Sequence, residues 1–267
     1  QNMDPCVLDL LSQHNIPDIS TGDSALGFDA VFVVHYTPLV QRRQDILNTV
    51  KNQFGIEPVF VEAFDREALT AEHLACIGDR DAQRAFINRS TTLGEDSLSL
   101  KHLSVYFYML QHSLQNVLIL EDDATFLQSD WKSPQSLWQH ILKVLPADYD
   151  MLFLSGCCEL HNIGTQISEH LYLAQSSRVS SMYLISQKGA RNMLRSLPLV
   201  ASIDFQMNYA AGWKDQWLEK MPRFHGPRTI DIKLYHTEPY MSEQSNKYRS
   251  ALAGELGLGL KNRGAGV

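Results

Sequence analysis

The sequence predicts one α/β domain in which helices cover both faces of a β-sheet. Short, wholly apolar runs such as residues 30–36 and 117–120 are typical of strands that are buried on both faces. Stretches with helical spacing of apolar residues lie between these runs, and this alternation is typical of an α/β sandwich. The chain has 267 residues, 44% of them hydrophobic, which is enough for one substantial core. We find no internal repeat and no linker that would divide it.

In the first half of the chain, the pattern predicts three strands and two helices. Residues 1–28 are polar, and we expect them to be irregular. Pro38 and the polar stretch after it lead from the first strand into a helix. The second helix is expected to be amphipathic, because its apolar residues fall near helical spacing: Leu98, Leu103, Tyr106, Phe107 and Leu110. We therefore expect strands at 30–36, 58–64 and 117–120, and helices at 40–54 and 98–115.

The second half continues the alternation. We expect a helix at 134–145, strands at 151–154, 170–174 and 180–186, a helix at 187–196, a helix that begins near Asp204, and a strand at 230–234. The last fourteen residues hold five of the fifteen glycines, so we expect 246–267 to be a flexible tail. The globular domain would then span residues 29–245.

Composition restricts the partners of the chain. The net charge of −7 argues against a broad nucleic-acid surface, which would need clustered Lys and Arg, so we expect no nucleic-acid partner. No apolar stretch approaches the ~20 residues of a membrane span, so we expect no transmembrane segment. An acidic protein that holds an acidic ligand needs a local cation.

The cysteines and one sequon bear on the compartment. The four cysteines (Cys6, Cys76, Cys157 and Cys158) form no Cys-X-X-Cys pair, so no structural zinc site is expected. We interpret Cys157 and Cys158 as buried thiols, and a Cys6–Cys76 disulfide stays open. Asn88-Arg89-Ser90 fits a glycosylation sequon, a pattern that is common by chance. The compartment is left open: the ER or Golgi lumen if the chain is eukaryotic and lacks an upstream segment, and otherwise a cytoplasmic or membrane-peripheral location.

Three carboxylates directly follow the apolar run at 117–120. Ligands of open α/β sheets bind beyond the carboxyl ends of strands, where Glu121, Asp122 and Asp123 emerge. Adjacent carboxylates repel one another, and a divalent cation would remove that penalty. Oxygen ligands suit Mg²⁺ or Mn²⁺, which often bridge carboxylates to substrate phosphates. A helix N-terminus or a solvated turn is the alternative interpretation of the triplet.

Several segments resemble glycosyltransferase family 25. Leu120-Glu121-Asp122-Asp123 matches the acidic end of the family's strand, and the segment 183–190 matches its Tyr-X-Ile-Ser-X-X-Gly-Ala pattern. Looser matches are Val31 to Tyr36 followed by Arg42-Arg43, Ala63 to Arg66, Lys101-His102, Tyr149 to Gly156, and Ile203-Asp204. The chain departs from the family at His35-Tyr36, where Asn-Leu is usual, and at Arg66, where Gly is usual. The resemblance covers about residues 30–245.

The resemblance implies a GT-A fold, which is Rossmann-like, in a single domain with a mixed central sheet. It also implies a UDP-sugar donor, often UDP-galactose or UDP-glucose, together with Mn²⁺ (or Mg²⁺) and inversion at the anomeric carbon. The acceptor would be a hydroxyl of a glycan or a protein. On this reading the chain is a metal-dependent hexosyltransferase.

The resemblance also suggests roles for individual residues. Asp123 with Glu121 or Asp122 would bind the metal, and His236, with His225 as the fallback, would be the C-terminal metal ligand. Asp204 would be the base that deprotonates the acceptor, or only a helix cap. The donor would contact Asp122 and five further residues, for some of which a solvated helix start or a core histidine is the alternative: Arg42, Arg43, Asp65, Lys101 and His102. Trp213 and Trp217 are expected to be core residues rather than a platform for an acceptor sugar.

Two other functions stay open. One is a transferase-like module that binds a ligand or partner without turnover, although the intact triplet argues against it. The other is a metal-dependent phosphoesterase or nucleotidyltransferase, which would need a second cluster of carboxylates or histidines. If Asp204 is not the base, Glu159, Asp150 or Asp215 would be tested next.

Overall fold

The computed structural model describes residues 4–13, 16–17, 19, 24–156, 164–174, 179–211, 230 and 232–245. Its central sheet is built from eight strands: β1 (Ala30–Val34), β2 (Val59–Val61), β3 (Asn116–Glu121), β5 (Met151–Phe153), β7 (Thr165–Ser168), β8 (Leu171–Leu173), β9 (Met182–Ser186) and β10 (Leu234–Thr237). Their order is β2-β1-β3-β9-β5-β10-β8-β7. A second, three-stranded sheet pairs β11 (Ser242–Gln244) with β4 (Ala124–Phe126) and β6 (Ser155–Gly156).

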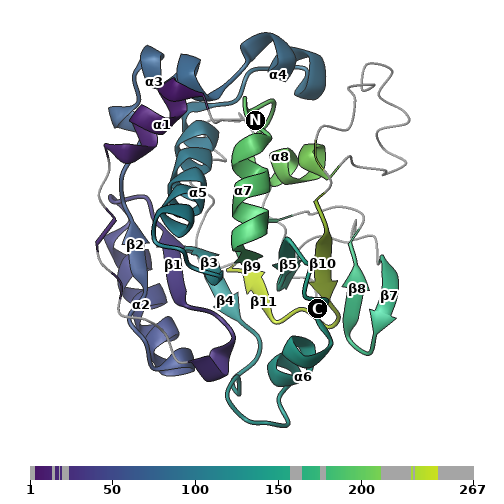
Figure 1. The fold of residues 1–267 in the computed structure, drawn as a ribbon. Coiled ribbons are helices and arrows are strands. Elements are labelled where there is room, and N and C mark those ends of the chain that lie inside the picture. The colour runs from purple at the N-terminus through teal and green to yellow at the C-terminus, as the bar shows by residue number, and fades with distance from the viewer. Residues whose placement is uncertain are drawn as a thin grey trace, which may run out of the picture.

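The described residues also form helices on both faces of the large sheet (Figure 1). They are α1 (Pro5–Ser12), α2 (Val40–Phe54), α3 (Ala71–Ile77), α4 (Arg80–Ile87), α5 (Leu93–Gln111), α6 (Leu137–Val144), α7 (Gln187–Arg195) and α8 (Ile203–Ala210), with short 3₁₀ turns at Ser24–Leu26 and Arg66–Ala68. The predicted α/β sandwich with a mixed central sheet is confirmed. None of these helices is long and apolar enough to cross a bilayer.

The direction of the strands decides where a ligand can bind. β1 pairs in parallel with β2 and β3, whereas β9 runs antiparallel to both β3 and β5. Val34 lies opposite Glu121 in the register of β1 and β3. The carboxyl ends of these two strands therefore meet at one edge of the sheet, and the acidic triplet emerges there.

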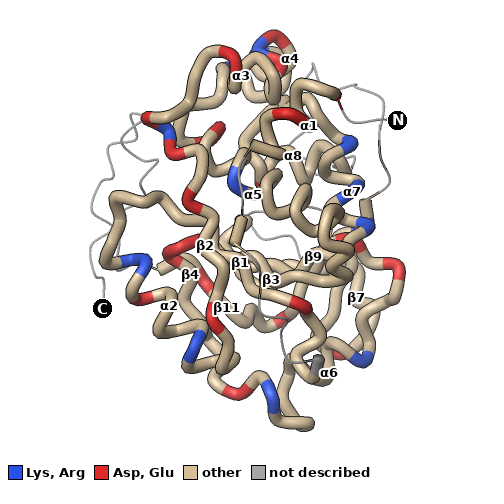
Figure 2. The backbone as a smooth tube through the Cα atoms, turned by 60° about the vertical axis from the view of Figure 1, so that its left-hand side comes forward, with Lys and Arg blue, Asp and Glu red and all other residues tan. Residues whose placement is uncertain are grey.

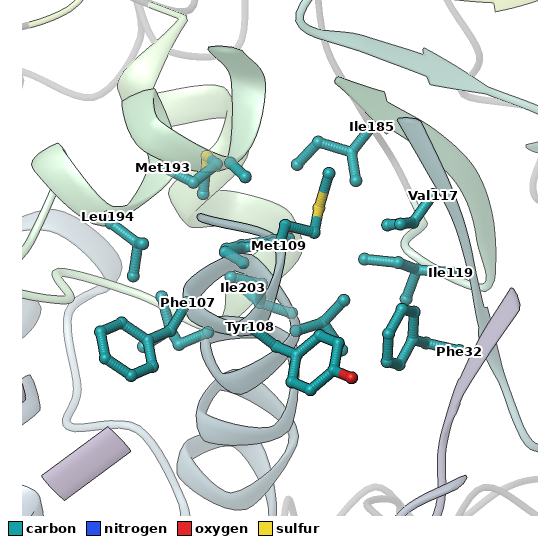
Figure 3. Close-up of a cluster of buried hydrophobic side chains, with 14 of the residues drawn as sticks. Phe32, Phe107, Tyr108, Met109, Val117, Ile119, Ile185, Met193, Leu194 and Ile203 are labelled. Atoms are coloured by element: carbon teal, nitrogen blue, oxygen red, sulfur yellow. The ribbon is translucent and has the colours of Figure 1, made fainter. Parts of the chain in front are cut away.

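Alternate residues of the buried strands belong to two separate cores. Phe32 of β1 and Ile119 of β3 face α5, α7 and α8, in the cluster that Figure 3 shows around Met109. Their neighbours Val33 and Leu118 face α2, α6 and two buried tryptophans. This period of two explains why the strands read as continuous apolar runs: both faces of the sheet are covered.

Helix α5 differs from the predicted amphipathic helix at 98–115. It begins at Leu93, where Thr92 and Glu95 form a capping box, and it is buried on almost every side. Its charged residues stay buried because they are paired. Glu95 accepts two hydrogen bonds of 2.7 Å from Arg89, and Asp96 accepts one of 2.8 Å from Arg80. The apolar spacing was a correct signal for a helix, but the helix is central to the fold rather than on its surface.

The N-terminal segment also differs from the prediction. Residues 1–28 were expected to be irregular, yet α1 forms within them after Asp4, whose carboxylate accepts a hydrogen bond from the Cys6 amide. Val7, Leu10 and Leu11 of α1 join the core around α5. The Cys6–Cys76 disulfide, which the sequence left open, joins α1 to α3. The expected tail at 246–267 and the residues Cys157 and Cys158 lie outside the described part of the chain.

Candidate active site

A cleft lies at the edge of the sheet where β1 and β3 end. It has a volume of about 630 Å³, which includes the space at its open mouth. Its walls come from the end of β1 and the start of α2, the acidic turn after β3, the first turns of α5 and the end of β11: Val34, His35, Tyr36, Leu39, Arg42, Arg66, Gly94, Ser97, Leu98, Lys101, Glu121, Asp122, Asp123 and Gln244. Figure 2 shows Lys and Arg interspersed with Asp and Glu along the described backbone.

Asp122 is held by protein groups on both of its carboxylate oxygens. Oδ2 accepts a hydrogen bond of 2.8 Å from His35 Nδ1, and Oδ1 accepts one of 2.9 Å from Arg42. Burial would raise the pKa of Asp122, but the hydrogen bonds from His35 and Arg42 outweigh it and hold the pKa below its usual value. Asp122 is therefore ionised, and each of its two carboxylate oxygens already accepts a hydrogen bond from a protein group. For this reason Asp122 is a weaker candidate for a direct metal ligand than Asp123.

Asp123 and Glu121 have the opposite character. Asp123 Oδ2 receives Arg42 at 3.3 Å and Gln244 at 3.2 Å, whereas the buried Oδ1 has no hydrogen-bond partner among the described residues. Burial raises the pKa of Asp123. Burial and then the charge of Asp123 raise the pKa of Glu121 to about 8, although Ser180 donates a hydrogen bond of 2.6 Å to it. A cation between Asp123 and Glu121 would relieve both carboxylates, so these two residues fit Mn²⁺ or Mg²⁺.

His236 does not belong to this group. The strand that was predicted at 230–234 begins at Leu234, so His236 lies inside β10 instead of after it. Two strands, β9 and β5, separate β10 from β3, a distance of roughly 14 Å at normal strand spacing. The buried His236 Nε2 accepts a hydrogen bond of 3.3 Å from the Gly164 amide. Across the described ranges no three His, Cys, Asp or Glu residues are grouped around a possible metal. The fallback ligand, His225, lies outside those ranges.

The two neighbouring arginines of α2 have different surroundings. Arg42 is buried and bridges Asp122 and Asp123 within the cleft. Arg43 lies outside the cleft, where its guanidinium stacks 4.1 Å from the centre of the Phe60 ring and pairs with Glu62. Consecutive helical residues point about 100° apart, so only one of them can face the triplet.

Lys101 lines the cleft and pairs with Asp65, which does not line it. Lys101 Nζ donates to Asp65 Oδ1 at 2.8 Å and to the Ala63 carbonyl at 2.7 Å, and Thr37 donates to the other oxygen of Asp65. Burial lowers the pKa of Lys101, and this effect is larger than the opposite effect of Asp65, whose charge and hydrogen bond raise the pKa. Phe64, between Ala63 and Asp65, has φ of 63°, a conformation that bulky residues rarely adopt and that often marks functional sites.

His102 is a core histidine, which was the alternative to its predicted donor contact. It is fully buried, is not among the residues of the cleft, and its Nδ1 lies 2.7 Å from the Tyr183 hydroxyl, which in turn meets Tyr106. Burial lowers the pKa of His102 to about 3, so its imidazole is neutral at physiological pH. Lys101 thus faces the cleft, whereas His102 faces the core.

Asp204 is not the N-cap of α8, which is Ser202, but it lies in the first turn of that helix. Its Oδ1 accepts hydrogen bonds from the Phe205 amide at 2.9 Å and from Ser202 at 2.7 Å, as expected in the first turn of a helix. Burial also raises the pKa of Asp204, and its charge contributes to the raised pKa of Glu121. Asp204 is thus electrostatically coupled to the triplet although it does not line the cleft.

Of the other candidate bases and the two tryptophans, the structure describes only Asp150. Asp150 has no exposed surface, and Lys188, Asn192 and the Lys233 amide hold its two oxygens, so it joins β5, α7 and the start of β10 as a structural residue. The remaining candidates lie outside the described residues: Glu159, Asp215, Trp213 and Trp217.

Comparison with known proteins identifies the family. Residues 28–207 match the family model described as glycosyltransferase family 25 (LPS biosynthesis protein). The chain belongs to glycosyltransferase family 25. A family member from Drosophila melanogaster is 26% identical over 66% of this chain and 29% of that protein. Procollagen galactosyltransferase 1 of Danio rerio is 27% identical over 81% of this chain and 36% of that protein.

Not every relative in family 25 carries an active name. The Bos taurus protein named "Probable inactive glycosyltransferase 25 family member 3" is 27% identical over 66% of this chain and 30% of that protein. The chain thus spans about a third of the length of these curated relatives. A solved glycosyltransferase involved in the glycosylation of the major capsid of PBCV-1 covers 85% of this chain and 97% of its own at 8% identity, and its TM-score of 0.37 adds nothing to the assignment.

The family 25 match contains most of the cleft but not all of it. Gln244 comes from β11, beyond the matched residues, and no local signal in the sequence pointed to it. His35 and Arg66 stand where the family usually has Asn and Gly, and both line the cleft. Arg66 also stacks on Tyr36, 4.6 Å from the ring centre. His35 directly follows β1, so its position at a strand end is a signal for a site residue, whereas Arg66 lies in the 3₁₀ turn beyond β2 and has no such signal.

Proposed function

We propose that this chain is a metal-dependent glycosyltransferase that moves a hexose, galactose or glucose, from a UDP-sugar to a hydroxyl of a glycan or protein acceptor with inversion. The observation that carries the proposal is the buried Asp123 Oδ1, which has no hydrogen-bond partner among the described residues, in a cleft at the carboxyl end of β3 that Glu121 also lines. Family membership and the galactosyltransferase name of a relative support this reaction class.

Asp123 and Glu121 would hold Mn²⁺ or Mg²⁺. When bound, the ion supplies charge that stabilises the UDP leaving group. Two protein carboxylates are too few to complete its coordination, which agrees with a cation that takes other ligands from phosphates and water. His35 and Arg42 keep Asp122 ionised and fixed in direction, so this residue is available to orient the donor. Arg42 and Lys101 add positive charge to the walls that face a diphosphate.

Asp204 would act on the acceptor. In an inverting transfer, the acceptor oxygen attacks the anomeric carbon, the bond from that carbon to the phosphate oxygen breaks, and UDP leaves with the electron pair. The proton of the acceptor hydroxyl goes to the Asp204 carboxylate. Because burial raises the pKa of Asp204, its carboxylate is a stronger base than an exposed aspartate.

A non-catalytic binding module is the second candidate, because a relative of similar identity is named inactive. A phosphoesterase or nucleotidyltransferase is the third candidate, and it would need a second cluster of carboxylates or histidines. Turnover of a UDP-sugar distinguishes the glycosyltransferase from the non-catalytic binding module. We expect UDP release from at least one UDP-sugar in the presence of Mn²⁺ and an acceptor, and its loss after EDTA treatment.

The test compares Asp123→Asn with Asp81→Asn, a control whose side chain is 91% exposed on α4. We expect Asp123→Asn to lower turnover at least ~100-fold and to weaken Mn²⁺-dependent UDP binding in calorimetry, whereas the control changes neither. Tight UDP binding without metal would contradict the metal role of Asp123. Metal-dependent UDP binding with no turnover of any donor would favour the binding module.

A further inference from the structure

The surface turn after α4 carries a feature that the proposed transfer reaction does not use. Asn88 follows the last residue of α4 and is exposed to solvent. Within the described part of the chain its carboxamide makes no hydrogen bond. Ser90, two residues later, places its hydroxyl at the same surface, 3.5 Å from Arg84. Asn88-Arg89-Ser90 is the only Asn-X-Ser/Thr sequence in the chain, and the intervening residue is not proline.

The turn is held in place from the protein side. Arg89 directs its guanidinium to the buried Glu95 through two hydrogen bonds of 2.7 Å, which fixes the turn against the start of α5. Asn88 has φ of 60°, so the chain turns sharply at this residue. With Arg89 anchored, the Asn88 side chain extends into solvent, where a large substituent would displace no packed group. Asn88 is also not among the residues of the cleft.

An independent feature indicates the compartment in which the chain folds. Cys6 and Cys76 form a disulfide with their Cα atoms 5.7 Å apart, within the usual range for such bonds. This disulfide joins α1 to α3, and α1 contributes Val7, Leu10 and Leu11 to the main core. Disulfides of this structural kind form in oxidising compartments, and the lumen where they form in eukaryotes is also where Asn-X-Ser/Thr sequences are glycosylated.

We propose that Asn88 carries an N-linked glycan. The donor is a lipid-diphosphate-linked oligosaccharide of the secretory pathway, and a host oligosaccharyltransferase performs the reaction. Asn88 Nδ2 forms a bond to the anomeric carbon of the oligosaccharide while the bond from that carbon to the phosphate oxygen breaks. The lipid diphosphate leaves with the electron pair, and Nδ2 loses one proton to the host enzyme. This assignment does not depend on the reaction that the chain itself catalyses.

A conformational role for Asn88 is the competing explanation, because Asn tolerates positive φ at the end of a helix. That role needs no hydroxyl at position 90, so Ser90 separates the two explanations. Ser90→Ala leaves Asn88 and its backbone unchanged but removes the sequon. Ser90→Thr keeps the sequon. Asn88→Gln removes the acceptor amide itself.

The experiment begins with the protein isolated from the cells that produce it. We expect digestion with an N-glycanase in heavy-oxygen water to reduce its mass and to convert Asn88 to labelled Asp in the peptide map. The full chain and its variants are then secreted from cultured eukaryotic cells. Wild type and Ser90→Thr should lose mass on digestion, whereas Ser90→Ala and Asn88→Gln should not. An unmodified Asn88 in the natural protein overturns the proposal, and so does a glycan that persists in Ser90→Ala.

Discussion

Replacement of Arg42 by Gln removes the positive charge that bridges the acidic triplet. The Arg42 side chain is 6% exposed, and its Nη1 atom lies 2.9 Å from Asp122 Oδ1 and 3.3 Å from Asp123 Oδ2. Loss of one partner from a buried ion pair costs about 3–5 kcal/mol, because a charge is left buried without compensation. Asp122 keeps its bond to His35 and Asp123 keeps its bond to Gln244, so we expect a loss near the lower limit, about 3 kcal/mol.

Arg43→Gln is the matched control on the next residue of α2. The Arg43–Glu62 pair is 42% exposed on both sides, and such pairs contribute about 0–1 kcal/mol, to which stacking on Phe60 adds about 0.5–1 kcal/mol. Urea unfolding in EDTA at neutral pH measures both variants. Equal losses of unfolding free energy would refute the claim that Arg42 is the counter-charge of the triplet.

The same variant tests the cation site. In Arg42→Gln the carboxylates of Asp122 and Asp123 lack their internal cation, so Mn²⁺ should bind more tightly than in the wild type when no nucleotide is present. At about 100 times its dissociation constant, Mn²⁺ would add about 2.7 kcal/mol to the unfolding free energy and recover most of the loss. Nucleotide affinity should fall, since Arg42 also faces the diphosphate. If Mn²⁺ fails to stabilise Arg42→Gln, Asp123 is not a metal ligand.

Three further changes test other parts of the structure. Asp204→Asn should lower transfer by ~10²–10⁴ while UDP affinity is kept, because the Asn oxygen can still accept the hydrogen bonds from Ser202 and the Phe205 amide. Unchanged kcat/KM would remove Asp204 from the mechanism. The pKa of His102 is lowered from 6.5 to about 3, so its contribution to stability is complete above about pH 6.5 and is lost as the pH falls towards 3, at up to about 1.4 kcal/mol per pH unit. His102→Gln should flatten this dependence between about pH 6.5 and pH 5 in urea unfolding, and an unaltered slope would assign the acid sensitivity to other groups. The Cys6→Ser/Cys76→Ser variant removes a disulfide that joins residues with a sequence separation of 70. Chain entropy predicts that the free energy of unfolding falls by about 4 kcal/mol. A fall below about 1 kcal/mol would show that α1 is held by its apolar contacts alone.

The strands and helices of the domain could be predicted because their signals are local. The predicted helix at 40–54 coincides with α2. The apolar run at 30–36 contains β1, and β3 extends the run at 117–120 by one residue at each end. Both faces of these strands are covered, so an uninterrupted apolar run was the correct signal. The acidic triplet could be located by the same logic, because the carboxyl end of a buried parallel strand is where ligands bind.

The choice between neighbouring side chains was decided only by the tertiary structure. Arg42 faces the triplet and Arg43 the surface, and Lys101 faces the cleft while His102 joins the core, because the rotation of a helix about its axis depends on what packs against it. The start of β10 at Leu234 removed His236 from the site, and β11 brought Gln244 to Asp123 across 121 positions of sequence. Such contacts arise from pairing between distant strands, and no window of the sequence contains both partners. Local patterns therefore determined the elements and the position of the carboxylates, and long-range packing determined which residues surround them.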